Sequence, residues 1–203
     1  MTHSSAGRNL RGAFVAVTSL FFMWGFITVL VDALIPRLKD VFELTFLQAG
    51  LVQFAWFAAY GLLSIPGGNL ISKIGYQKGI LVGLATAGLG CLLFYPAAAT
   101  RLYPLFLLAL FVVAGGITIL QVAANPYISV LGPDESASAR LNLSQAFNSF
   151  GTTVAPVVAA SFLLGDQILS GDAIEALADA DRQAYFAGEA SAVQVPFVML
   201  ALA

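Results

Sequence analysis

One carboxylate lies inside an apolar stretch of the sequence. Asp32 follows FITVLV and precedes ALI, where a membrane-spanning helix would hold it beside hydrocarbon. An ionised carboxylate is costly there. It must face a water-filled cavity, find a partner or carry a proton, because desolvation disfavours the charged form. Placement at the membrane interface is the alternative, since Asp32 lies about 31 Å along an untilted helix from Arg11. The residues leave both positions open.

Amide side chains recur at helical spacing in other apolar stretches. Gln121 and Asn125 are four residues apart and share one helix face. Amides both donate and accept hydrogen bonds, which suits the hydroxyl groups of a neutral sugar. A single amide more often joins two helices, a contact worth about 0.6 kcal/mol on average. Stripes on several helices, together with Asp32, favour a cavity for a polyhydroxyl ligand. The other stripes are Asn142, Gln145, Asn148 and Thr152, and Gln53, Tyr60 and Ser64.

The sequence lacks the patterns of catalytic and metal chemistry. Its one histidine, His3, lies in a polar stretch, and its one cysteine, Cys91, lies in an apolar stretch that predicts packing. There is no glycine-rich phosphate loop, Ser/His/Asp arrangement or Cys/His ligand spacing. We therefore expect no enzymatic activity, no metal and no other cofactor. Trp24 and Trp56 could stack on a sugar ring, but packing is the more common role of such residues.

The helices that position these residues must cross a membrane. Apolar residues make up 59% of the 203-residue chain and charged residues 10%, with a mean hydropathy of +0.88. These values exclude a disordered chain, a basic nucleic-acid binder and an ordinary soluble domain. Five windows without charge hold 20 or more residues, enough to cross about 30 Å of hydrocarbon. Spans are expected at residues 12–35, 47–71, 79–99, 103–131 and 141–164, with an incomplete one at 193–203.

The segments outside the spans predict the topology. Residues 1–11 are expected to form a cytoplasmic tail, because Arg8 and Arg11 precede the first span. The connection 166–189 is expected to be an extracytoplasmic loop, and it carries six acidic residues against one basic residue. Apolar residues at near-helical spacing within it predict a short amphipathic helix on the membrane surface. These apolar residues are Ile174, Leu177, Ala178 and Tyr185.

An internal repeat relates the first and fourth spans. GFITVLVDALIP (25–36) and GGITILQVAANP (115–126) align without gaps and share six of twelve positions. This pair corresponds in a fold of two inverted three-helix repeats, whose sites lie at the repeat interface. Each element ends in a proline, which frees a backbone carbonyl one turn earlier. Helices tolerate this where they face protein or a water-filled cavity.

The segment LQVAANPYISVLGPDESASARLNLSQAFNSFG (120–151) resembles sugar symporters of the L-fucose permease and glucose/galactose transporter type, in the major facilitator superfamily. Supporting stretches are SLFFMWGFITVLVDALIP, FLQAGLVQ and KIGYQKGILVGL. The resemblance implies an all-α integral membrane fold: the six-helix N-terminal half of a major facilitator fold, built from two inverted three-helix repeats, with a truncated last helix. It also implies a bacterial inner-membrane protein. The partners would be a monosaccharide, a proton, the lipid bilayer and a missing C-terminal half, with no nucleic acid.

The resemblance further implies roles for single residues. A span-1 carboxylate of the family matches Asp32, which favours a cavity-facing acid that takes up the proton. A span-4 glutamate of L-fucose permease is replaced by Gln121, which cannot titrate. This departure resembles the glucose/galactose branch and leaves Asp32 as the proton-coupling candidate. Gln145 and Asn148 match amides that line the family's cavity. We expect Asp32, Gln121, Asn125, Gln145 and Asn148 to bind the sugar.

The function expected is secondary active transport of a glucose- or galactose-like hexose, coupled to protons, by alternating access. Two other functions fit the sequence less well. One is a non-transporting sugar sensor or membrane scaffold that uses a half-fold. The other is a half-size transporter that works as a dimer.

Overall fold

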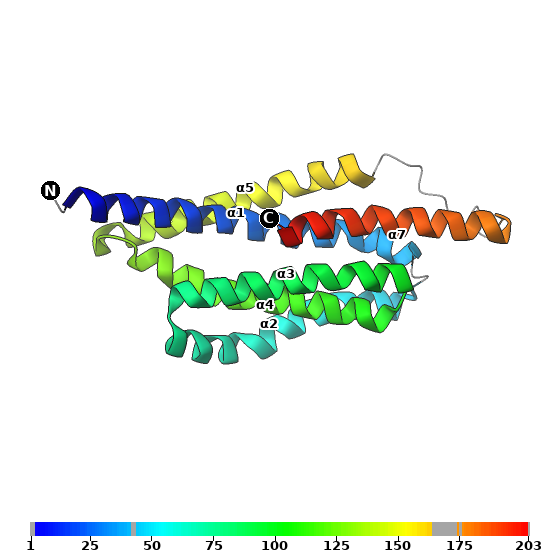
Figure 1. Ribbon diagram of the computed structural model, residues 1–203, viewed down its shortest axis with the longest axis horizontal. Helices are drawn as coiled ribbons and strands as arrows, with labels where there is room; N and C mark the ends of the chain where they lie inside the picture. The colour runs from blue at the N-terminus through cyan, green and yellow to red at the C-terminus, as the bar shows by residue number, and fades with distance from the viewer. Residues whose placement is uncertain (1–2, 42–43, 164–173, 175, 203) are drawn as a thin grey trace.

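The computed structural model describes residues 3–41, 44–163, 174 and 176–202. Within these residues the chain forms six long helices and one 3₁₀ turn, with no strand, so the expected all-α class is confirmed (Figure 1). The helices lie roughly along one direction, as the bundle in Figure 1 shows. Their bounds are α1 His3–Val41, α2 Phe46–Ile74, α3 Tyr76–Thr100, α4 Tyr103–Val130, η1 Asp134–Ser136, α5 Ala137–Leu163 and α7 Asp179–Leu202.

Several of these helices have the length and composition of membrane spans. Among the described residues, four helical stretches meet both criteria: Leu10–Ala33 of α1 and the whole of α2, α3 and α4. The helix α5 is 27 residues long, which is long enough to cross a membrane. It carries the polar stripe that includes Gln145 and Asn148.

The first and last helices differ from the expected boundaries. The helix α1 begins at His3, so the expected tail is already helical there, and it continues to Val41, past the expected end at residue 35. Extending a helix costs much less than nucleating one. The helix α7 begins at Asp179, well before residue 193. Tyr185 therefore belongs to the last helix and not to a separate surface helix. Residues 166–173 and 175 of the expected loop lie outside the described residues.

Helix pairing follows the pattern of two repeated three-helix units. The helix α1 packs along α5, and α4 packs along α2 and α3. If α1 corresponds to α4 and α2 to α5, the pair α1–α5 is the counterpart of the pair α4–α2. This is the exchange expected of two inverted repeats. Asp32 of α1 and the polar stripes of α2, α4 and α5 are thus carried by these two pairs.

The helices α3 and α4 approach so closely that glycine is required between them. A Cβ added at Gly83 would lie 2.7 Å from the backbone nitrogen of Leu120 and 2.9 Å from the carbonyl oxygen of Gly116.

Cys91 and Trp56 are buried in the main core cluster, which confirms that both contribute to packing. Phe94 of α3 stacks on Phe197 of α7 with ring centroids 3.8 Å apart.

Candidate polar site across four helices

Asp32 lies on a polar face shared by α1 and α2. Its side chain is exposed, and the side-chain amide of Gln53 hydrogen-bonds to its carboxylate. Its charge also acts on the phenol of Tyr60, further along α2. Gln53 and Tyr60 are seven residues apart, two helical turns, so both face the same side of α2. The carboxylate expected from the sequence is therefore accompanied by two polar groups of the neighbouring helix.

A hydrogen bond joins α2 to α4 beside this acid. The amide Nε2 of Gln121 donates to the hydroxyl oxygen of Tyr60 at 2.9 Å. Both side chains are half-buried, and the ring of Tyr60 lies against Trp56 with centroids 6.3 Å apart. Tyr60 and Gln53 belong to the predicted stripe on the second span but were not predicted as site residues. Their spacing of seven residues, which places both on one face of the second span, was the sequence signal that could have identified them as site residues.

A second pair of amides joins α4 to α5. The Nε2 group of Gln145 lies 3.4 Å from Oδ1 of Asn125, one helical turn beyond Gln121 on α4. At this length the hydrogen bond is weak. Gln145 is exposed and Asn125 is half-buried. Two amides in such a contact can readily exchange their mutual bond for bonds to a hydroxylated ligand, since each both donates and accepts.

Asn148, the remaining predicted site residue, holds α5 against α1. Its Nδ2 group donates to the carbonyl oxygen of Phe21 at 3.0 Å, and its backbone lies directly against Gly25. A buried hydrogen bond between the hydroxyls of Thr18 and Ser144, 3.0 Å long, joins the same two helices. The Asn148 amide is thus partly committed to helix packing, which leaves its carbonyl oxygen Oδ1 for a ligand.

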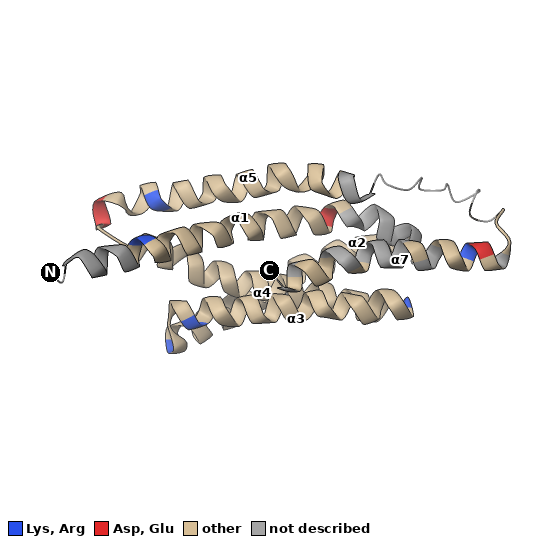
Figure 2. Ribbon diagram, turned by 45° about the horizontal axis from the view of Figure 1, so that its top comes forward, with Lys and Arg blue, Asp and Glu red and all other residues tan. Residues whose placement is uncertain are grey.

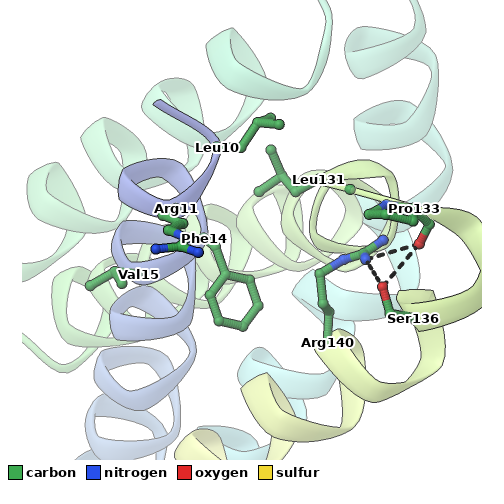
Figure 3. A pocket seen from close by; sticks show the side chains of 9 residues that line it. Leu10, Arg11, Phe14, Val15, Leu131, Pro133, Ser136 and Arg140 are labelled. Atoms are coloured by element: carbon green, nitrogen blue, oxygen red, sulfur yellow. Dashed lines mark hydrogen bonds between the residues drawn. The ribbon is translucent and has the colours of Figure 1, made fainter. Parts of the chain in front are cut away.

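A cavity of about 460 Å³ lies at the end of the bundle where α1 begins, and none of the predicted site residues lines it (Figure 3). Its walls are mostly apolar, with Phe14 and Leu131 among them. Arg140 lies at its edge and donates to the carbonyl oxygens of Ile128 at 3.1 Å and Pro133 at 3.0 Å. These bonds cap the last turn of α4 and fix its connection to α5.

The described residues hold no group of three or more His, Cys, Asp and Glu side chains that could bind a metal ion. The candidate site is instead a series of contacts among uncharged donors and acceptors, with one carboxylate at its α1 end. It joins Asp32 and Gln53 on α1 and α2, Tyr60 and Gln121 on α2 and α4, and Asn125 and Gln145 on α4 and α5. This arrangement can take up one proton and can hydrogen-bond a neutral ligand that carries several hydroxyl groups.

Comparison with known proteins gives a consistent match along the chain. Residues 12–168 match the sequence model of the Major Facilitator Superfamily. The chain is 52% identical over 202 residues to the glucose/galactose transporter of Brucella abortus (strain 2308), covering 100% of this chain and 46% of that protein. It is 40% identical over 188 residues to the L-fucose-proton symporter of Escherichia coli (strain K12), covering 92% and 43%.

Comparison of the fold with solved structures identifies the same superfamily. The crystal structure of the Major Facilitator Superfamily transporter FucP in the outward conformation superposes with a TM-score of 0.84 at 40% sequence identity. The match covers 94% of this chain and 46% of that chain. The chain therefore spans about half the length of the relatives that it matches.

Proposed function

Since the chain belongs to the major facilitator superfamily, we propose that it forms the N-terminal half of a proton-coupled hexose symporter that works by alternating access. One observation carries the proposal: three contacts between polar side chains, Gln53 with Asp32, Gln121 with Tyr60 and Gln145 with Asn125, link α1, α2, α4 and α5 in turn. Relatives named as a glucose/galactose transporter and an L-fucose-proton symporter support the class of substrate and the coupled ion. In this proposal a C-terminal six-helix half closes the other side of the site.

Asp32 takes up the proton in this mechanism. A neutral carboxyl group can donate a hydrogen bond to a sugar hydroxyl, whereas a carboxylate can only accept one. Loss of charge also removes the cost of holding an ion in a site closed off from water. Protonation and sugar binding therefore favour each other, and by linkage each raises the affinity for the other by the same factor.

The amides bind the sugar. Gln121, Asn125 and Gln145 present donors and acceptors from α4 and α5, and Asn148 adds its carbonyl oxygen. Because Gln121 is an amide and not a carboxylate, it binds without titrating, and the described site carries one acid. We assign the substrate as a glucose- or galactose-like hexose. We place the protein in the bacterial inner membrane with the start of α1 in the cytoplasm.

The test of the proton site uses the full-length transporter in proteoliposomes with an imposed pH gradient. Wild-type protein is expected to accumulate labelled galactose or glucose against its concentration gradient. Asp32→Asn is expected to abolish accumulation and to keep sugar exchange between the two sides. Asp181→Asn, which changes an exposed acid of α7, is the matched control. Accumulation by Asp32→Asn at the wild-type level would refute the coupling role.

A second measurement tests the sugar ligands. Gln121→Ala is expected to weaken sugar binding, and unchanged affinity would remove Gln121 from the site. Sugar binding by the wild-type protein without any uptake would refute transport and would support a sugar sensor.

A further inference from the structure

Tyr60 lies between the proposed proton site and the proposed sugar site and touches the second directly. We propose that Tyr60 is a positioning residue whose hydroxyl transmits the charge state of Asp32 to Gln121. The inference rests on the proposed function, because it needs a proton at Asp32 and a sugar at Gln121. It adds a residue on α2 that couples the two, which neither the polar stripe nor the carboxylate alone would identify.

The hydrogen bond to Gln121 leaves the phenolic proton of Tyr60 free. The hydroxyl oxygen accepts from Nε2 of Gln121 at 2.9 Å, so its own O–H is not used in that bond. A phenol hydroxyl can both donate and accept. The ring is held in place by its packing against the buried Trp56. The ring is therefore fixed, but the hydroxyl hydrogen can still rotate about the C–O bond.

The same hydrogen bond orients the Gln121 amide. Because Nε2 is held by Tyr60, the carbonyl oxygen Oε1 on the opposite side of the amide is turned away from α2. It can accept a hydrogen bond from a sugar hydroxyl in that orientation. Without the tyrosine oxygen, the amide would rotate freely and would lose part of its affinity for the sugar.

The charge of Asp32 decides where the free O–H points. Its negative charge acts on the Tyr60 phenol and attracts the positive end of the O–H dipole. When Asp32 is neutral this attraction ends, and the hydroxyl is free to align its lone pairs with the Nε2 group of Gln121. Proton uptake on α1 thus strengthens the hydrogen bond that orients Gln121 on α4, although Asp32 and Gln121 need not touch.

Few other side chains could link the charge of Asp32 to the sugar site. Within the described residues, Gln53 of α2 is the side chain that acts on Asp32, and Gln121 and Asp32 are the side chains that act on Tyr60. Gln53 and Gln121 do not titrate. Figure 2 shows the charged residues gathered toward the two ends of the bundle, with long uncharged stretches of helix between them. In the described part, a pH effect on the sugar site therefore has Asp32 as its source, and Tyr60 is the residue beside Gln121 on which its charge acts.

The experiment measures galactose affinity of the full-length transporter, in lipid nanodiscs, across a series of pH values. Tyr60→Phe keeps the ring and removes the hydroxyl. Tyr103→Phe is the matched control, because it also removes a hydroxyl that bridges α4 and α2, donating to the carbonyl oxygen of Gln48 at 2.7 Å. Asp32→Asn is measured beside them to show whether the pH dependence comes from that acid.

Wild-type affinity is expected to be highest at low pH and to fall as Asp32 loses its proton. Tyr60→Phe is expected to lose about fivefold in affinity at low pH, the effect of one neutral hydrogen bond. It should lose much less at high pH, so its pH profile is flattened. Tyr103→Phe should keep the wild-type profile.

Three results would overturn the inference: an unchanged profile in Tyr60→Phe, a loss of affinity of the same factor at every pH, or the same flattening in Tyr103→Phe. Failure of the proposed function gives a different pattern. Wild-type protein would then bind no galactose, or its profile would match that of Asp32→Asn.

A double-variant cycle gives an independent check. If Tyr60 acts through Gln121, the double variant Tyr60→Phe with Gln121→Leu should lose no more affinity at low pH than Gln121→Leu alone. Additive losses would show that the two side chains act separately and would overturn the positioning role.

Discussion

Replacing Arg140 with glutamine tests how the connection between α4 and α5 is held. Its guanidinium donates to the carbonyl oxygens of Ile128, Ser129 and Pro133 and to the hydroxyl of Ser136, the last at 2.6 Å. Ile128 and Ser129 belong to the last turn of α4, where carbonyl groups have no partner within the helix. This connection joins the two helices that carry Asn125 and Gln145, so Arg140 helps to fix how α4 and α5 meet.

The magnitude follows from the number and exposure of these bonds. A hydrogen bond to a charged group contributes about 1.5–3 kcal/mol. The bond to Pro133 is exposed, so water replaces it at little cost, and the two bonds to α4 carbonyls are partly buried. Counting these two at the lower value, and allowing for partial replacement by water, gives a loss of about 2–3 kcal/mol. For a chain of this size that corresponds to a melting temperature lower by about 4–12 °C.

Cys91 provides the assay. It is the one cysteine of the chain and is 1% exposed, so a thiol-reactive fluorescent dye reports unfolding of the detergent-solubilised protein on heating. Lys73→Gln, at an exposed cation in the last turn of α2, is the control for loss of charge alone. The melting temperature of Arg140→Lys should lie between those of the wild-type protein and Arg140→Gln. An ammonium group keeps the positive charge but lacks the several coplanar N–H donors of the guanidinium group. If Arg140→Gln melts at the same temperature as Lys73→Gln, the capping role is refuted.

Two further predictions concern the helix contacts and the tryptophans. Gly25→Ala should cost about 1–3 kcal/mol, because the new Cβ would collide with the backbone of Asn148. Gly61→Ala, with no atom within 4 Å of its Cβ position, should be neutral or stabilising in the same melting assay, and equal effects would contradict the close approach of α1 and α5. Trp56→Phe should lower the melting temperature and leave galactose affinity unchanged, because Trp56 is only 6% exposed and phenylalanine keeps an aromatic ring against Tyr60. Weaker binding at unchanged stability would show that the indole contacts the sugar.

The sequence identified most spans because charge-free windows of sufficient length are a direct consequence of the membrane's thickness. The same rule cannot place the start of the last helix, because a helix can extend beyond the hydrocarbon. Asp181, Arg182 and Glu189 precede the apolar window, yet all three lie within α7, because charged side chains outside the hydrocarbon do not oppose helix formation. Asp181 in the first turn also faces the positive end of the helix dipole, which stabilises a helix start.

The polar site could be predicted in part. The stripes containing Gln121, Asn125 and Gln145 follow from helical spacing, and the structure brings these residues into contacts between helices. Tyr60 was missed as a site residue because a tyrosine in an apolar helix is equally expected as a packing residue. Asn148 forms a bond that spacing cannot reveal, since its acceptor is a backbone carbonyl oxygen on α1. Sequence patterns show which side chains share a face, but not which main-chain atoms lie opposite.

The pairing of α1 with α5 has a consequence for synthesis. The hydroxyls of Thr18 and Ser144 bond across 126 residues of sequence, whereas α3 and α4 are neighbours along the chain. At typical translation rates, roughly 6–25 seconds pass between the appearance of Thr18 and that of Ser144. During that interval the polar groups of α1 have no α5 to pair with, while α3 and α4 can already associate. The helix α1 is therefore made before α3 and α4 but is fixed in place after them, when α5 becomes available.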